Sequence, residues 1–193
     1  MITHIRGKLV EKNPTYAIVE CNGIGYFLHI SLNTYSKIPD IEAIKFYTYL
    51  SIKEDAHTLF GFVDKVEREV FKLLISVSGV GTSIARTMLS SMTPEQVQHA
   101  IASEDVATIQ SAKGIGAKTA QRLIIDLRDK IVKTYQLSED SNQSNNTIKE
   151  EALSALEVLG FSRRQIEKLV QKIIQEAPDT TLENIIKQAL KNL

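Results

Sequence analysis

The sequence predicts an α+β chain of several domains: an N-terminal five-stranded β-barrel, a central helical domain with a repeated motif, and a C-terminal three-helix module. Short β-rich segments separated by turn residues fill residues 1–63, and from Asp64 the apolar residues recur at the three- and four-residue spacing of helices. A polar stretch then separates residues 64–134 from a last helical segment. We therefore expect domains at 1–63, 64–134 and 148–193, with a linker at 135–147.

Five short strands are expected in the first domain. Their ranges are 2–11, 16–21, 25–31, 44–52 and 58–63. Asn22-Gly23, between the second and third strands, is a strong signal for a hairpin turn, and the charged loop 53–56 separates the last two strands. So many short strands in about 60 residues predict a small closed barrel, and the OB-fold is the leading expectation.

The C-terminal segment is predicted to be a small helical module on a tether. Residues 136–147 are polar and acidic, so they bury too little apolar surface to offset their ordering entropy, and we expect them to be flexible. Helices are expected at about 148–159, 163–176 and 181–191, with capping boxes at 162–165 and 180–183. A tethered module of this size is typical of a protein-interaction domain.

Composition narrows the classes of protein. The chain of 193 residues has a net charge of zero, and no apolar run is long enough for a membrane span. With one cysteine, Cys21, it has no disulfide framework, and we expect a cytoplasmic protein that does not enter the membrane. The histidines, at positions 4, 29, 57 and 99, show no metal-ligand spacing. We therefore expect no metal, no cofactor and no catalytic residue.

The central segment contains an internal repeat. Gly79-Val80-Gly81 recurs 35 residues later as Gly114-Ile115-Gly116, and Ala85 recurs as Ala120. Each copy predicts a helix, a tight hairpin and a second helix. Glycines let the hairpin turn and let a phosphate approach the backbone, and the amides that open the second helix are free donors at the positive end of its dipole.

The repeat therefore predicts two phosphate-binding hairpins, which contact the DNA backbone with little sequence preference. The residues expected there are Gly79, Gly81, Thr82, Ser83 and Arg86 in the first copy, and Gly114, Gly116, Ala117, Lys118, Thr119 and Arg122 in the second. A dinucleotide fingerprint is excluded by the absence of a third glycine and of a preceding strand, and a P-loop by Ala117 standing between the glycine and the lysine. A repeat that serves only to pack helices remains the alternative, since residues 64–134 have ten basic against eight acidic residues.

The order of barrel, paired hairpins and tethered module resembles the RuvA family, the junction-binding subunits of a branch-migration complex. Further matching features are Gly23-Ile-Gly-Tyr26, the segment 53–62, and Gly160-Phe161. The resemblance implies a non-catalytic subunit that binds four-way (Holliday) junctions, holds them open, and targets a hexameric RuvB-type ATPase to them through the C-terminal module. It also implies a homotetramer or a pair of tetramers, a RuvC-type junction resolvase as a further partner, and a role in recombination, DNA repair and the SOS response to DNA damage.

The resemblance also gives Glu54 and Asp55 a role. In the family, a paired acidic turn forms a central pin that repels phosphates at the crossover; without the resemblance, the pair is an ordinary solvated loop. The sequence departs from the family at Ser83 and Ala117, where family members often have lysine. Weaker or more salt-sensitive binding is one consequence we expect of these departures.

Two other functions stay open at this point. The first is a helix-hairpin-helix accessory subunit of a repair nuclease or glycosylase. It is disfavoured because the sequence shows no carboxylate cluster for two metals, and Asp126 and Asp129 lie within a helix that also has Arg128 and Lys130. The second is a protein-interaction scaffold whose hairpins only pack against one another.

Overall fold

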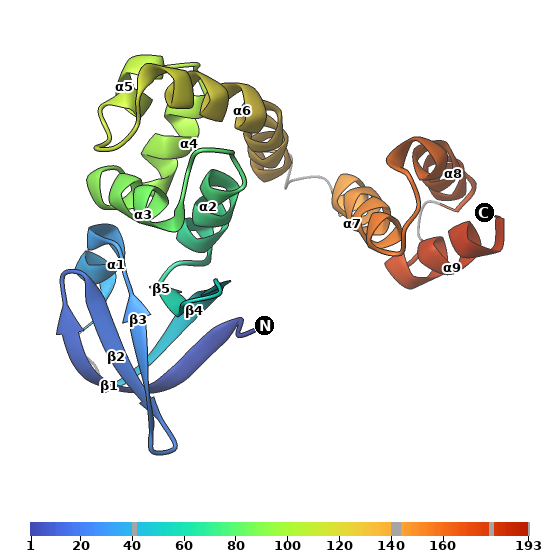
Figure 1. Cartoon of the computed structure of the whole chain (residues 1–193). Helices are drawn as coiled ribbons and strands as arrows, with labels where there is room; N and C mark the ends of the chain where they lie inside the picture. Colours follow the sequence, from blue (N-terminus) through green and yellow to red (C-terminus); the bar gives the residue numbers. More distant parts are fainter. Residues whose placement is uncertain (40–41, 140–143, 178–179, 193) are drawn as a thin grey trace. The chain divides into compact units, whose positions relative to one another are not determined.

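The computed structural model describes residues 1–39, 42–139, 144–177 and 180–192. The chain forms two compact units, Met1–Val132 and Lys133–Leu193, which are treated separately below (Figure 1). The first unit contains the barrel and the repeated motif, and the second contains the C-terminal helices.

The N-terminal part is a closed five-stranded barrel, as predicted. Its strands are β1 (His4–Asn13), β2 (Tyr16–Cys21), β3 (Ile24–His29), β4 (Ala43–Ile52) and β5 (His57–Phe62), in the order β1-β2-β3-β5-β4. Only the β3–β5 pair is parallel among the five strand pairs of this barrel. The predicted turn joins β2 to β3, with positive φ at Asn22 and Gly23 (50° and 81°). Alternate residues of the strands, including Val19, Leu28 and Phe46, fill the barrel.

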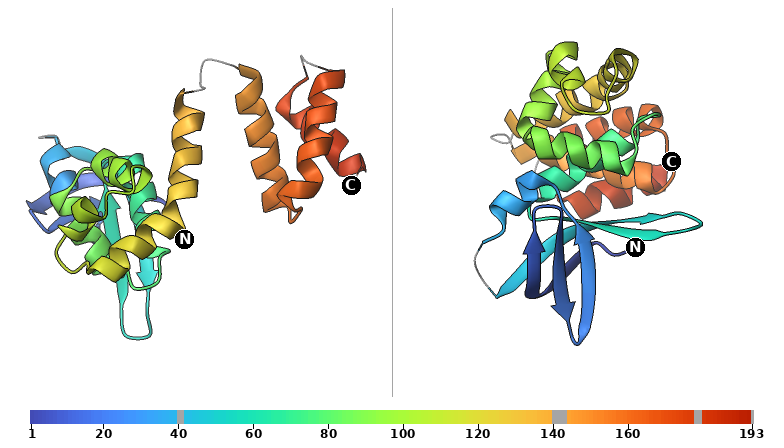
Figure 2. Two further views of the ribbon diagram at one scale, coloured as in Figure 1. Left: turned by 90° about the horizontal axis from the view of Figure 1, so that it is seen from above. Right: turned by 60° about the vertical axis from the view of Figure 1, so that its left-hand side comes forward.

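Two features of the barrel were not predicted. A short helix, α1 (Leu32–Lys37), follows β3, and its N-cap is Ser31. The end of the β4–β5 hairpin also extends beyond the barrel, because β4 pairs with β1 only as far as Tyr47 but pairs with β5 as far as Ile52. Figure 2 shows this two-stranded ribbon projecting away from the other strands.

The central helices pack against β5 of the barrel. They are α2 (Lys65–Ile75), α3 (Thr82–Ser91), α4 (Pro94–Ala102), α5 (Val106–Gln110) and the first part of α6 (Ala117–Glu139). Phe60 and Phe62 of β5 belong to the same apolar core as these helices, and both rings lie 5.1 Å from the ring of Phe71. The barrel thus has its own core, while β5 also contributes Phe60 and Phe62 to the core of the helices.

The C-terminal unit has the three expected helices, α7 (Ser144–Val158), α8 (Arg163–Glu176) and α9 (Leu182–Asn192). Leu153, Leu156, Val170 and Ile185 lie in their shared core. The capping box at Ser162 is confirmed, whereas at α9 the capping hydroxyl belongs to Thr181, which accepts a bond from the Asn184 amide at 3.4 Å.

The expected linker at 135–147 is shorter than composition predicts. Helix α6 continues to Glu139 and α7 begins at Ser144, so helical residues occupy both ends of the expected linker. Extending an existing helix adds a backbone hydrogen bond for each residue without the cost of nucleation, and glutamine, leucine and glutamate are good helix formers. The remaining linker residues, 140–143, lie outside the described residues. No helix in the described part of the chain is long and apolar enough to cross a membrane.

Candidate nucleic-acid interface

The first hairpin joins α2 to α3 in a tight turn. Gly79 has a φ of +94°, a conformation that favours glycine, and the buried Val80 donates its amide to the Val77 carbonyl at 3.0 Å. Gly81 is the N-cap of α3, and its carbonyl accepts the Ala85 amide at 3.0 Å. Because glycine has no side chain, it cannot cap the amides of the first turn of α3, which remain available to an anion.

The second hairpin, between α5 and α6, repeats this geometry. Gly114 has a φ of +93°, and each backbone hydrogen bond of the first hairpin has a counterpart in the second. Ile115 N donates to Ala112 O at 3.1 Å, and Ala120 N donates to Gly116 O at 2.9 Å. The hydroxyls of Ser76 and Ser111 also match, since each donates at 2.7 Å to the carbonyl three residues earlier. The repeat predicted from sequence is therefore a structural repeat down to individual hydrogen bonds.

The second glycine of each hairpin borders open space. A Cβ on Gly81 or Gly116 would meet no atom within 4 Å in the described part of the chain, apart from its own neighbours, and neither residue has a positive φ. Neither steric crowding nor backbone conformation in the protein itself therefore requires glycine at these positions. A ligand that approaches the backbone closely would require it.

The cationic side chains are concentrated at the second hairpin. Lys118, in the first turn of α6, is exposed and has no hydrogen bond or ion pair with any described residue. Lys113, which sequence analysis overlooked, is exposed one residue before Gly114. It too has no hydrogen bond or ion pair with any described residue. Arg122 is exposed but lies 3.7 Å from Asp126.

The first hairpin has neutral side chains at the matching positions. Ser78 and Ser83, both exposed, occupy the positions that match Lys113 and Lys118 of the second hairpin. The two hairpins thus share a backbone geometry but differ in charge. Thr82 and Thr119 are half-buried, and Ala117 is exposed at the start of α6.

Arg86, which was expected to contact DNA, contacts the barrel in this structure. Its guanidinium lies 3.2 Å from the His29 ring nitrogen Nδ1 and donates to the Thr15 carbonyl at 3.4 Å, so it joins α3 to the barrel. Burial, and next the nearby Arg86 charge, lower the pKa of His29. The position equivalent to Arg122 is Thr87, one residue further along α3, which explains why the two arginines face different surroundings.

Glu54 and Asp55 lie at the tip of the projecting ribbon. Both are exposed, in the loop between Ile52 and His57 that is closed by a bond from Lys53 N to Ala56 O at 2.9 Å. Among the described residues, no group of three or more His, Cys, Asp or Glu side chains is placed to hold a metal ion.

The fold and the two hairpins define a barrel protein with a tandem helix-hairpin-helix region. Family models match in the same order: the RuvA N terminal domain at residues 1–61, a SAM-like helix-hairpin-helix tandem at 71–129, and the RuvA C-terminal domain at 147–193. The chain belongs to the RuvA family.

Full-length relatives agree with this assignment. The chain is similar to a protein of Christiangramia forsetii (64% identical over 193 residues) and one of Flavobacterium psychrophilum (61% over 193), in each case over 100% of both chains. A protein of Cytophaga hutchinsonii is 51% identical over 197 residues and 99% of both chains. All three are named Holliday junction branch migration complex subunit RuvA.

Proposed function

We propose that this chain is the DNA-binding, non-catalytic subunit of a cytoplasmic branch-migration complex. It binds four-way junctions, holds them open, and targets a hexameric RuvB-type ATPase to them in recombination and DNA repair. The observation that supports this most strongly is the pair of matching hairpins, whose second glycines border open space in the described structure. The names of the full-length relatives support the choice of a junction as ligand.

In this proposal each hairpin holds one phosphate on backbone amides. At the first hairpin, the amides of residues 82–84 donate to phosphate oxygens that approach over Gly81. At the second, the amides that open α6 do the same next to Gly116, and the ammonium groups of Lys113 and Lys118 add charge. Amides and lysines contact phosphates and not base edges, so binding is independent of base sequence.

We further propose that the chain acts as a homotetramer, alone or as a pair of tetramers. A four-fold assembly matches the symmetry of an open junction, and it presents two hairpins for each DNA arm. The eight carboxylates of Glu54 and Asp55 then surround the centre, where they repel phosphates in a partly desolvated place. Continuous duplex laid across the centre is penalised most, which raises the preference for an open junction.

The C-terminal unit is proposed to bind the motor. It has exposed apolar side chains at the end of α7, where Val158 is 87% and Leu159 57% exposed. Exposed apolar residues next to each other are typical of a protein-binding surface. ATP hydrolysis then belongs to the motor, and a RuvC-type resolvase binds the same junction as a further partner.

A gel-shift comparison of a four-way junction with linear duplex of equal length tests the proposal. We expect much tighter binding to the junction, whatever its base sequence, and an affinity that falls steeply with salt. Equal affinity for both DNAs at moderate salt would favour an accessory subunit of a repair nuclease or glycosylase. Binding to neither would favour a scaffold whose hairpins only pack.

The acidic pair has its own test. Replacing Glu54 with Gln and Asp55 with Asn removes the proposed repulsion, so affinity for duplex should rise more than affinity for junction. Both dissociation constants are measured at one salt concentration. If the ratio of the two dissociation constants does not change, Glu54 and Asp55 belong to an ordinary solvated loop.

A further inference from the structure

A buried carboxylate joins the barrel to the first helix of the DNA-binding region. Glu67, in the first turn of α2, has no exposed surface, and no other charged side chain that the structure describes is buried. Its carboxylate accepts hydrogen bonds from the hydroxyls of Ser31 and Thr34, the second at 2.7 Å. Ser31 also accepts the Thr34 amide at 2.9 Å as the N-cap of α1. These three residues are called the Glu67 cluster.

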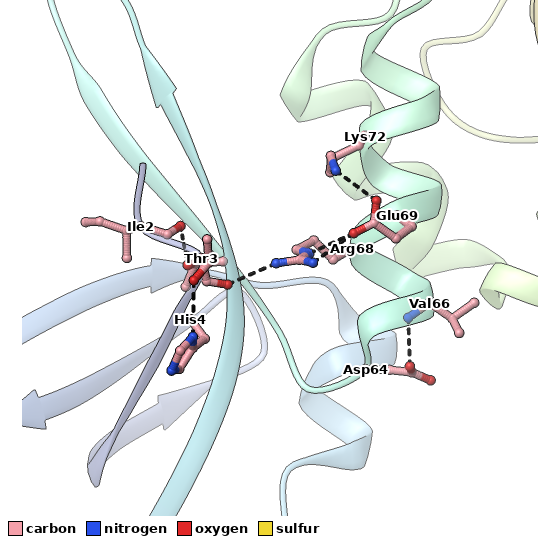
Figure 3. A network of polar contacts seen from close by, with 9 residues as sticks. Ile2, Thr3, His4, Asp64, Val66, Arg68, Glu69 and Lys72 are labelled. Atoms are coloured by element: carbon pink, nitrogen blue, oxygen red, sulfur yellow. Dashed lines mark hydrogen bonds and ion pairs between the residues drawn. The ribbon is translucent and has the colours of Figure 1, made fainter. Parts of the chain in front are cut away.

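Neighbouring contacts hold the barrel against the helices from other sides. Figure 3 shows Arg68, the next residue of α2, donating to the Thr3 carbonyl at 3.0 Å, and its guanidinium also lies 5.4 Å from the centre of the Tyr47 ring of β4. On α3, the Ser90 hydroxyl accepts the Leu32 amide of α1 at 3.1 Å. Both helices of the first hairpin motif are therefore bonded to the barrel by directional polar contacts.

The Glu67 cluster is not explained by stability alone. Burial raises the pKa of the Glu67 carboxyl, and the Ser31 and Thr34 hydroxyls lower it only in part, so the charged form is costly here. A buried polar group of this kind often stabilises no more than an apolar side chain of the same volume. Hydrogen bonds are directional, however, and they fix an angle between two surfaces that apolar contacts leave less well defined.

The angle between the barrel and the central helices determines where the acidic loop lies relative to the hairpins. The β4–β5 ribbon leaves the barrel at Tyr47, which packs against the helical core, and it ends at Glu54 and Asp55. A ribbon of this length reaches about 20 Å, so a tilt of about 10° at its base moves the tip by roughly 3.5 Å, well beyond the ~0.5 Å tolerance of a positioned site.

We propose that Glu67 is a positioning residue that fixes the angle between the phosphate-binding hairpins and the acidic loop, and thereby sets the preference for open junctions over duplex. This inference rests on the proposed function of the chain. Glu67 touches no DNA in this arrangement and acts only through α1 and the barrel.

The test uses the full-length protein with three changes at the cluster. Glu67→Leu removes the hydrogen bonds of the carboxylate, and Glu67→Gln retains an acceptor and a donor for the hydroxyls. Ser31→Ala with Thr34→Val removes the two hydroxyl donors and leaves Glu67, Asn33 and Lys37 in place. Glu95→Gln is the matched control, because Glu95 is an exposed glutamate in the first turn of α4. Thermal unfolding of each variant establishes that it is folded.

Two readouts are needed. The first is the ratio of dissociation constants for duplex and junction at one salt concentration. The second is the distance between spin labels at Ala56→Cys and Gln110→Cys in a Cys21→Ser background, measured by pulsed electron paramagnetic resonance. Both labelled positions are exposed, and they report on the acidic loop and on the base of the second hairpin.

We expect Glu67→Leu and the Ser31/Thr34 double variant to broaden or shift the distance distribution and to lower the junction preference at least about five-fold, mainly by raising duplex affinity, because a displaced acidic loop repels duplex less. Glu67→Gln and Glu95→Gln should stay close to the wild type in both readouts. If Glu67→Leu does not fold, the double variant alone decides the outcome. A folded variant with a lower melting temperature but an unchanged distance and ratio overturns the inference, because Glu67 is then only structural. A wild type without junction preference overturns the proposed function instead, while the distance measurement still tests whether Glu67 fixes the angle.

Discussion

Replacing Gly116 with alanine separates the folding role of the hairpin from its proposed binding role. Its φ is outside the left-handed region, and a Cβ would meet no atom within 4 Å in the described structure other than its immediate neighbours. Alanine gains about 0.4–1 kcal/mol over glycine by restricting the unfolded chain. It loses roughly 0.5–1 kcal/mol because Gly116 precedes the first residue of α6, where glycine is the better cap. The two effects nearly cancel, so the melting temperature should hardly move.

The expected effect on DNA binding is much larger. If a phosphate approaches the backbone at Gly116, a methyl group there displaces it from the α6 amides. One hydrogen bond to a charged group contributes about 1.5–3 kcal/mol, which corresponds to roughly 10- to 150-fold in affinity. Fluorescence anisotropy with a labelled four-way junction measures this loss, and circular dichroism measures stability on the same sample.

Two other glycines complete the experiment. Gly114→Ala should lose stability, by about 1–3 kcal/mol, because the φ of +93° is strained for alanine. Gly25→Ala, in strand β3, is the control outside the two phosphate-binding hairpins, since its Cβ would meet only Ile18 Cγ2 at 3.8 Å. A Gly116→Ala protein with wild-type stability and wild-type affinity would refute phosphate binding at this hairpin and leave it a packing motif.

Three further predictions use different measurements. Lys113→Ala and Lys118→Ala should each make the dependence of log affinity on log salt shallower by about 0.9 for every phosphate left unneutralised, without changing base preference; a changed base preference would contradict backbone binding. Cutting the chain at about residue 140 should leave an N-terminal fragment that folds and binds junctions, because Met1–Val132 is a compact unit, and loss of binding would assign the C-terminal helices to the DNA site. Because burial raises the pKa of Glu67, the folded chain takes up its proton at higher pH than the unfolded chain. The wild type should therefore gain stability relative to Glu67→Gln as the pH falls toward 4.5, the ordinary pKa of the carboxyl, whereas a constant difference in melting temperature would contradict the raised pKa.

Local patterns explain why much of the fold was predictable. Alternation and the Asn22-Gly23 turn located the strands to within a few residues, and the two Gly-X-Gly triplets located both hairpins. Helix α1 was not predictable in this way, because six residues are too few to show helical periodicity. The shared core was also hidden, since Phe60 and Phe62 alternate like any strand residues and nothing local tells which neighbour they pack against.

The candidate site was predictable where the repeat is regular and not where it is irregular. Aligning the two hairpins drew attention to the glycines they share, but it obscured Lys113, because its counterpart Ser78 is neutral. Arg86 was placed by proximity in sequence, and only the fold brings it to His29. Glu67 lies at helical spacing from Val70, Phe71 and Leu74, on the buried face of α2, but its charge hides this in the sequence. Its carboxylate is accommodated by hydroxyls at the start of α1, more than thirty residues earlier.

The distribution of charge fits a protein that binds DNA phosphates mainly through the amides of its own main chain. Net charge is zero, and the first hairpin has serines where the second has Lys113 and Lys118. Amides at a helix N-terminus attract phosphate without contributing net charge, so a neutral chain need not be a poor ligand for a polyanion. In a neutral chain, acidic groups can also penalise wrongly placed phosphates without being outweighed by a general positive field. In the proposed function, selection among DNA shapes therefore depends more on how the hairpins and the acidic loop are held relative to one another than on total electrostatic attraction.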